Sequence, residues 1–249
     1  MKNLEASFSI FTMKGVLPFL LRGVAFTVVI SAVAVLIGVV FGYLLAIARN
    51  YCTKKDNRIL GILATLYIEL FRNTPLLLWI FICLVFLPIS GFLKRKMLGL
   101  SSVEAGLLFK GAFALILFES SVIAEIVRGG LNAIPAGQFE AAKSQGFSSV
   151  QTMIYIILPQ VYHKIVPTLL SQVISTIKDS SYLANIAIIE LMARTKQVLA
   201  NANRYNGTGQ INVSDVFVLF GFAFAIYFVI DFTLSIIVRR TAKKELRAR

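Results

Sequence analysis

The chain has 249 residues, of which 57% are hydrophobic and only 15% are charged. Soluble domains carry about 25% charged residues, so this composition excludes an ordinary soluble protein and indicates lipid as the main solvent. The formal net charge of +13 would suit a nucleic-acid-binding protein, but the basic residues flank apolar runs and form no basic stripe, so we expect no nucleic-acid partner. The densest basic cluster directly follows the last apolar run and comprises Arg239, Arg240, Lys243, Lys244, Arg247 and Arg249.

The first predicted elements are an interfacial segment and a membrane span. Residues 1–19 mix apolar and polar side chains, which suits a short helix at the membrane surface. Residues 24–48 carry no charge and are long enough to cross a hydrocarbon core of about 30 Å as a helix. Inside this run, Gly38 and Gly42 have the small-xxx-small spacing that lets two helix backbones approach closely. We expect this pair to pack within the chain, although the same spacing also occurs in dimer interfaces.

A second apolar stretch, residues 59–89, contains Pro75. Proline has no backbone N–H to donate, so the helix should bend or break near Asn73 and Thr74. Three further runs predict spans at residues 103–127, 165–189 and 213–238.

Five spans would place the two chain ends on opposite sides of the membrane. The dense basic tail and the basic loop at residues 49–58 favour a cytoplasmic C-terminus and an outside N-terminus, because cytoplasmic flanks are enriched in Lys and Arg. The cluster Lys94, Arg95 and Lys96 argues against this orientation, so the bias is modest. In the favoured orientation the polar stretch 128–158, which predicts one or two short helices, is cytoplasmic.

This polar stretch contains the most specific pattern in the chain. Pro135 suits the start of a short helix and Gly146 suits a left-handed cap at its end. Glu140 would offer a directed charge to a basic partner, and the two alanines after it a surface of low relief. An ordinary surface helix between two spans is the alternative. The full pattern, E-A-A, three residues, G, nine residues and I-x-L-P, consists of Glu140, Ala141, Ala142, Gly146, Ile156, Leu158 and Pro159.

The spacing of this pattern resembles the EAA loop of ABC importer permeases. Three other segments are similar to the polar amino-acid branch, which imports histidine, glutamine and arginine: FRNTPLL at 71–77, EIVRGGLNAIPAGQ at 125–138 and IKDSS at 177–181. The similarity covers residues 20–238. Two positions depart from the usual family residues, because Asn73 stands where glycine is usual and Tyr182 where leucine is common.

The resemblance implies an all-α membrane protein of the type I ABC-importer permease fold, with five transmembrane helices and a cytoplasmic coupling-helix loop. The permease domain would be residues 20–238, between the interfacial segment 1–19 and a basic cytoplasmic tail, 239–249. The implied function is the import of polar amino acids across the bacterial inner membrane. The implied partners are two cytoplasmic ABC ATPase subunits, a second identical or homologous permease subunit, and a periplasmic or lipid-anchored amino-acid-binding protein.

No catalytic residue, metal site or cofactor is expected in this chain. It lacks the G-x-x-x-x-G-K-[ST] sequence that cradles phosphates, so ATP and magnesium would be bound by the partner ATPase. A stand-alone secondary transporter or channel for a small polar solute is the main alternative, but no internal repeat is visible. A membrane protease is a weaker alternative, because the chain has one histidine and no G-x-S-x-G sequence.

Ionisable side chains inside the predicted spans are costly in lipid and are functional candidates by default. An amino acid needs a cation for its carboxylate and an anion or carbonyl oxygens for its amino group. The substrate-pathway candidates are Arg72, Asn73, Thr74, Glu119, Lys178, Asp179, Ser180 and Ser181. Mutual pairing is the alternative, because the pairs Glu69 with Arg72 and Glu125 with Arg128 are each spaced to meet on one helix face. The identity of the amino acid and of the second permease subunit stays open.

Overall fold

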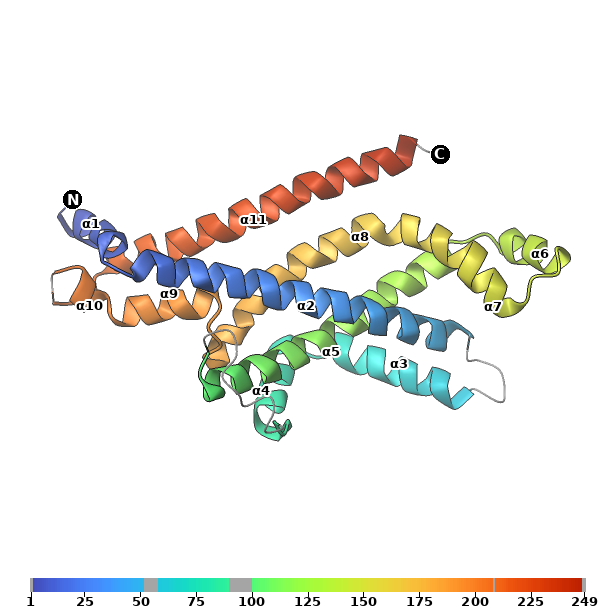
Figure 1. Cartoon of the computed structure of the whole chain (residues 1–249), viewed down its shortest axis with the longest axis horizontal. Helices are drawn as coiled ribbons and strands as arrows, with labels where there is room; N and C mark the ends of the chain where they lie inside the picture. Colours follow the sequence, from blue (N-terminus) through green and yellow to red (C-terminus); the bar gives the residue numbers. More distant parts are fainter. Residues whose placement is uncertain (1, 52–57, 90–99, 208, 248–249) are drawn as a thin grey trace. The chain divides into compact units, whose positions relative to one another are not determined.

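A computed structural model describes residues 2–51, 58–89, 100–207 and 209–247, and within them the side chains from residue 4 to residue 240. The described chain folds into helices (Figure 1). Lys94, Arg95 and Lys96, most of the basic loop 49–58 and the tail side chains after Arg240 lie outside this description. In chain order the elements are α1 (Lys2–Phe8), the 3-10 helix η1 (Ser9–Thr12), α2 (Val16–Tyr51), α3 (Arg58–Arg72), α4 (Leu76–Phe86), α5 (Ser102–Asn132), α6 (Ala136–Ser144), α7 (Ser149–Gln151), the π-helical turn η3 (Thr152–Ile157), α8 (Leu158–Asp179), the 3-10 helix η4 (Ser180–Ile186), α9 (Leu191–Ala200), α10 (Ala202–Tyr205) and α11 (Val213–Arg247).

The candidate membrane spans agree in number with the sequence analysis. The bend predicted near Asn73 and Thr74 is confirmed, because α3 and α4 meet there at 107°. Counted as one span, this bent pair brings the total to five. The other four helices that are long and apolar enough to cross a membrane are Val16–Tyr51, Ser102–Asn132, Ser149–Ile186 and Val213–Arg240.

Three predicted boundaries differ from the helices of the structure. The first span begins at Val16, so the boundary predicted after residue 19 falls inside α2. The fourth begins at Ser149, well before residue 165, because α7 and η3 run into α8 without a break. Polar residues there lower the hydropathy but do not interrupt the backbone hydrogen bonds of a helix. The last helix continues past residue 238 to Arg247.

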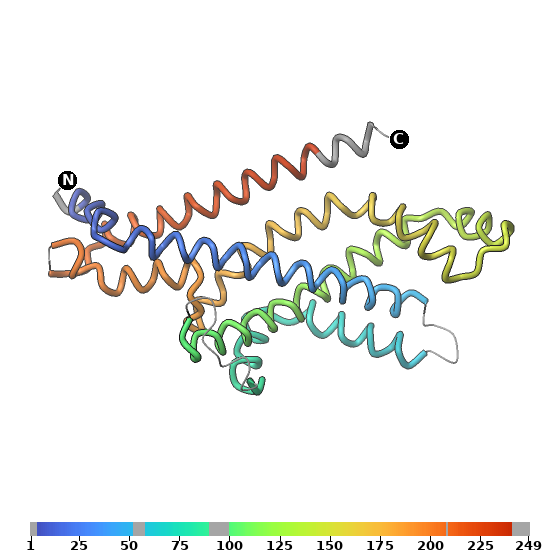
Figure 2. The backbone as a smooth tube through the Cα atoms, viewed as in Figure 1, coloured from blue at the N-terminus to red at the C-terminus, as the bar shows by residue number. Residues whose placement is uncertain are grey.

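The chain divides into two compact units, and the division cuts through long helices. Figure 2 traces the backbone of these helices, coloured by residue number. The first unit comprises Met1–Ala34, Leu77–Leu115 and Ser175–Thr233; the second comprises Val35–Leu76, Ile116–Ile174 and Leu234–Arg249. Each has its own apolar core. The first core includes Ile10, Val16, Leu20, Val198, Ala202 and Leu219. The second includes Ala46, Ile68, Ile123, Val127, Leu131, Ile157, Val161 and Ile165.

The two glycines of α2 allow a close helix contact inside the second unit. A Cβ atom at Gly42 would lie 2.8 Å from Ile123 Cγ2 and 3.0 Å from the backbone nitrogen of Ala124, both on α5. A Cβ atom at Gly38 would lie 3.2 Å from Glu119 Cβ. The expected packing of this small-xxx-small pair within the chain is therefore confirmed.

Candidate functional site

The short helix α6 is closed at both ends by its local sequence. Pro135 precedes it in an extended conformation, with φ −60° and ψ 140°. Gly146 follows it in the left-handed region, with φ +81°. The Gly146 N–H donates to Lys143 O at 3.0 Å and the Phe147 N–H to Ala142 O at 3.1 Å, which is the Schellman arrangement. The predicted glycine cap is therefore confirmed.

One face of α6 is exposed and the other is packed. Glu140 and Ala141 are exposed, and Glu140 forms no ion pair within the described part of the chain. Ala142 is 2% exposed, so it packs inward and does not belong to the outer surface. The expectation that both alanines form a low-relief exposed face is thus wrong for Ala142, because its helical position points toward the core of its own chain.

Contacts with the following helix hold α6 in place. Phe139 packs against the second core beside Met153. Gln160 Nε2 donates to Gln138 Oε1 at 3.1 Å. Lys164 Nζ, one turn further along α8, donates to Ala133 O at 2.7 Å, in the segment that leads into α6. These contacts fix the base of α6, while Glu140 and Ala141 stay exposed.

The second half of the E-A-A pattern lies at the start of the long helix and not in a loop. Ile156 belongs to the π-helical turn, and Leu158 and Pro159 begin α8. Pro159 has no N–H to donate to the carbonyl four residues earlier, and the wider π turn directly precedes it. The pattern from Glu140 to Pro159 was expected to form one loop; in the structure its first half is α6 with the turn after it, and its second half belongs to the long helix.

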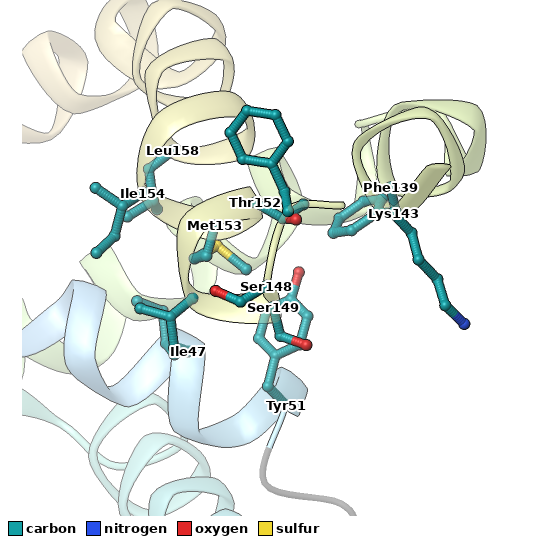
Figure 3. Close-up of a pocket in the computed structure, with 12 residues that line it drawn as sticks. Ile47, Tyr51, Phe139, Lys143, Ser148, Ser149, Thr152, Met153, Ile154 and Leu158 are labelled. Atoms are coloured by element: carbon teal, nitrogen blue, oxygen red, sulfur yellow. The ribbon is translucent and has the colours of Figure 1, made fainter. Parts of the chain in front are cut away.

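A pocket of about 720 Å³ opens beside α6, within the second unit (Figure 3). Its apolar wall includes Ile47 at the end of α2, Phe139 of α6 and Met153 of the π turn. The hydroxyl groups of Tyr51, Ser148, Ser149 and Thr152 add polar positions, whereas Lys143 extends away from the other lining side chains. The pocket and the exposed face of α6 together offer an amphipathic surface for another macromolecule.

A cluster of charges joins α2, α3 and α5 in the second unit. Glu125 pairs with Arg49 at 3.2 Å and with Arg72 at 3.6 Å. It also accepts hydrogen bonds from Arg128, as the helix spacing predicted. One partly exposed carboxylate therefore contacts three guanidinium groups from three helices.

Glu69 was expected to pair with Arg72, but it has other partners in the structure. It accepts a hydrogen bond from Arg49 at 2.7 Å and one from Asn73 at 3.0 Å, while Arg72 turns to Glu125. Thr74 donates its hydroxyl to Leu70 O at 2.6 Å. The bend between α3 and α4 thus gathers the candidates Arg72, Asn73 and Thr74 in one place.

The remaining substrate-pathway candidates fall in both units. In the second unit, Glu119 is fully buried on α5 and accepts from Gln172 Nε2 at 2.9 Å. In the first unit, Ser180 is buried and donates to Ile177 O at 2.7 Å. Beside it, Lys178 is exposed, and Asp179 and Ser181 are half-buried. The candidates therefore form one group at the α3–α4 bend, one group where α8 ends, and Glu119 in the core.

A buried glutamate that was not predicted from the sequence joins three helices of the first unit. Glu190 is 0% exposed and caps α9, accepting from Met192 N at 2.9 Å and Ala193 N at 2.6 Å. Its carboxylate also accepts from Tyr227 OH at 3.0 Å and Thr27 Oγ1 at 3.4 Å. Burial raises the pKa of Glu190, and these hydrogen bonds oppose part of the rise. The available signal was an acidic cap residue between an apolar run and a helical segment.

Arg194 is likewise buried beneath this cap. It is only 6% exposed, although it is a charged residue that follows an apolar run. Its guanidinium donates to Phe19 O at 2.7 Å and Ile189 O at 3.2 Å, and lies 4.3 Å from the centre of the Phe19 ring. Burial lowers its pKa, because the charged form loses hydration. Carbonyl oxygens and an aromatic face thus take the place of water.

The family of binding-protein-dependent transport system inner membrane components matches residues 38–244. The chain belongs to this family. The permease is 34% identical over 224 residues to the "Probable glutamine ABC transporter permease protein GlnP" of Bacillus subtilis, covering 90% of this chain and 92% of the relative. It is 33% identical over 233 residues to the glutamate/aspartate import permease protein GltK of Escherichia coli O6:H1, covering 91% and 95%.

Solved structures show the same fold. A crystal structure of an amino acid ABC transporter with histidines superposes on this permease with a TM-score of 0.71 and 26% identity, over 94% of this chain and 98% of the solved chain. An inward-facing methionine ABC transporter superposes with a TM-score of 0.64, over 92% of this chain and 98% of the solved chain. Its sequence is 20% identical, so this similarity supports the fold alone. The all-α permease fold is therefore shown.

Family membership fixes the general role. This chain is a multi-pass inner-membrane permease subunit of an ABC transporter and not its ATPase. The alternatives of a stand-alone transporter and a membrane protease are thereby set aside. Among the described residues, no group of three His, Cys, Asp or Glu side chains could hold a metal ion.

Proposed function

We propose that this permease is the translocation subunit of an importer for a polar amino acid of the glutamine and glutamate class. The names of two relatives that match nearly the whole chain support this class. The observation that carries the proposed coupling is α6, a short helix anchored at its base with Glu140 exposed and without an ion pair in the described chain. ATP and magnesium belong to separate ATPase subunits.

The proposed assembly follows from this role. Two cytoplasmic ATPase subunits each receive α6 of one permease subunit, so the C-terminus is cytoplasmic and the N-terminus is outside. The partner permease is a second copy or a homologue, and a periplasmic or lipid-anchored binding protein delivers the amino acid. The amphipathic pocket beside α6 and the exposed Glu140 suit a partner that offers apolar and basic side chains.

The proposed substrate pathway uses the charges that the spans carry. Arg72 and Lys178 are exposed, so each can reach an amino-acid carboxylate. Asn73, Thr74 and Glu119 in the second unit and, separately, Asp179, Ser180 and Ser181 in the first unit are the proposed polar residues of the pathway. Bent helices expose backbone groups, and transporters place their sites at such breaks.

Co-purification from the native host tests the docking role of α6. We expect the wild-type permease to bring down an ATPase and Glu140→Lys to lose it, because a reversed charge repels a basic partner surface. Glu5→Lys is the matched control, since Glu5 is an exposed glutamate of the first unit. Equal recovery of the ATPase by all three proteins would contradict docking through Glu140.

Uptake of labelled amino acids in proteoliposomes tests the pathway and the substrate class. Arg72→Gln and Lys178→Gln should reduce uptake while the assembled complex is retained. Glutamine and glutamate should compete with the transported label better than leucine does. Normal uptake by both variants would remove these two residues from the pathway, and competition by leucine alone would overturn the substrate class.

A further inference from the structure

A second cavity, of about 600 Å³, lies between the end of α2 and one face of α3 in the second unit. The α3 residues that line it recur every three or four positions and so form one helix stripe. At the start of α3, Gly61 contributes no side chain, which deepens the groove. The side chains that line the groove are Arg49 from α2 and Arg58, Ile62, Thr65, Leu66 and Glu69 from α3.

Among the described lining residues of the groove, two arginines face one glutamate. Arg58 is exposed and makes no ion pair with any residue that the structure describes. Arg49 donates to Glu69 and Glu125, which uses two of its five N–H groups. Among the lining residues that the structure describes, Glu69 is the one acidic side chain, and Arg49 and Asn73 both donate to it. Guanidinium donors therefore remain for a further anion.

An exposed apolar surface runs beside the groove along α3. Ile59 is 75% exposed, Ile62 56%, Leu66 62% and Leu70 46%. α2 is a candidate span that ends at Tyr51, so Arg49 lies near the end of this apolar helix, where the sequence becomes polar. Lipid headgroups lie at such ends of a span, and acyl chains lie beside the apolar residues that follow.

We infer that the groove between Arg49 and Arg58 binds the phosphate headgroup of an anionic phospholipid whose acyl chains cover the outer face of α3. Guanidinium groups bind phosphate oxygens in pairs, and basic pockets between membrane helices are sites for anionic headgroups. Inorganic phosphate offers the same oxygens but would leave Ile62 and Leu66 uncovered. The inference requires only that the end of α2 and the start of α3 lie at a membrane face. It therefore does not depend on the orientation of the chain in the membrane.

Native mass spectrometry of the full-length permease in detergent tests this site, with phosphatidylglycerol or phosphatidylcholine added. We expect phosphatidylglycerol to bind the wild type, and Arg58→Gln to weaken this binding about fivefold, the effect of one basic residue at an anionic surface. Arg58→Lys keeps the charge and should restore most of the binding. Arg204→Gln removes an exposed arginine of α10 and is the matched control, with binding unchanged.

Thermal unfolding adds a measurement that does not depend on survival in the gas phase. Phosphatidylglycerol should raise the melting temperature of the wild type and of Arg204→Gln more than that of Arg58→Gln. Equal binding and stabilisation by phosphatidylcholine, or full retention of both effects in Arg58→Gln, would overturn the inference. Displacement of phosphatidylglycerol by inorganic phosphate at equal concentration would also overturn it, because the site would then be one for free phosphate.

Discussion

Two glutamates, one in each unit, are stabilised in opposite ways. Glu190 of the first unit is fully buried, and the donors that contact it in the described part of the chain are uncharged: two backbone N–H groups, a tyrosine and a threonine. Glu125 of the second unit is partly exposed, with 22% of its side chain accessible, and three arginines surround it. A glutamate thus caps a helix in the first unit, and another glutamate forms the centre of an ion-pair cluster in the second unit.

The contrast indicates different tolerance to change. A buried carboxylate held by fixed dipoles has no substitute partner, so its loss leaves several donors unsatisfied. In a partly hydrated cluster, water and neighbouring carboxylates can replace a lost partner. We therefore expect the Glu190 site to fix the local fold and the Glu125 site to allow rearrangement between α2, α3 and α5.

The largest expected effect is that of Glu190→Ala. Removing the carboxylate uncaps α9 and leaves the donors of Thr27 and Tyr227 buried, which should lower the free energy of unfolding by about 3 kcal/mol. Thermal unfolding in detergent measures the loss. Glu104→Ala is the control, because Glu104 accepts from Ser101 N at 2.8 Å in an exposed position. That variant should lose about 1 kcal/mol, and an equal loss in both variants would contradict the special role of burial.

The second largest effect is expected for Arg194→Met, which should lower the free energy of unfolding by about 2 kcal/mol. Methionine keeps much of the side-chain volume between α2 and α9 but cannot donate to Phe19 O and Ile189 O. The same thermal measurement applies, with Arg204→Met as an exposed control that should leave the melting temperature nearly unchanged. A stability equal to wild type in Arg194→Met would show that water satisfies both carbonyl oxygens.

The features that the sequence could predict are those that depend on neighbouring residues along the chain. Apolar runs located every span, and Pro75 located the bend, because length, hydropathy and a missing N–H are local properties. The pattern around Glu140 predicted a capped short helix for the same reason. The start of the fourth span was predicted too late, because hydropathy falls around Gln160 and His163 while the backbone stays helical.

The polar contacts were harder to predict, because they depend on which helices meet. The pair of Glu125 with Arg128 lies on one helix and was predictable from its spacing. The contact of Glu69 with Arg49 joins two helices and was not. Glu190 and Arg194 lie outside the apolar runs, where a charged residue suggests exposure, and only the packing of α2 and α11 around them makes them buried.

Glu125→Gln tests the expected tolerance of the ion-pair cluster in the second unit. Its partners are partly exposed, so the free energy of unfolding should fall by only about 1 kcal/mol, and the fall should shrink in high salt. Thermal unfolding at low and high ionic strength measures both effects. Glu119→Gln changes a buried glutamate of the same helix, and its effect should not depend on salt. A salt-independent loss in Glu125→Gln would indicate that the cluster is as rigid as the Glu190 site.

The smallest expected effect is a pH dependence that belongs to Glu190. Burial raises its pKa in the folded chain, so the folded state binds more protons than the unfolded state between the two pKa values. The free energy of unfolding should then fall as the pH rises from about 4.3, the ordinary glutamate value, through the raised pKa of the folded state. Glu190→Gln removes this titration, so the stability of wild type minus that of the variant should decline over this range. A difference that rises with pH would mean that the hydrogen bonds from Met192 and Ala193 outweigh the loss of hydration of the Glu190 carboxylate.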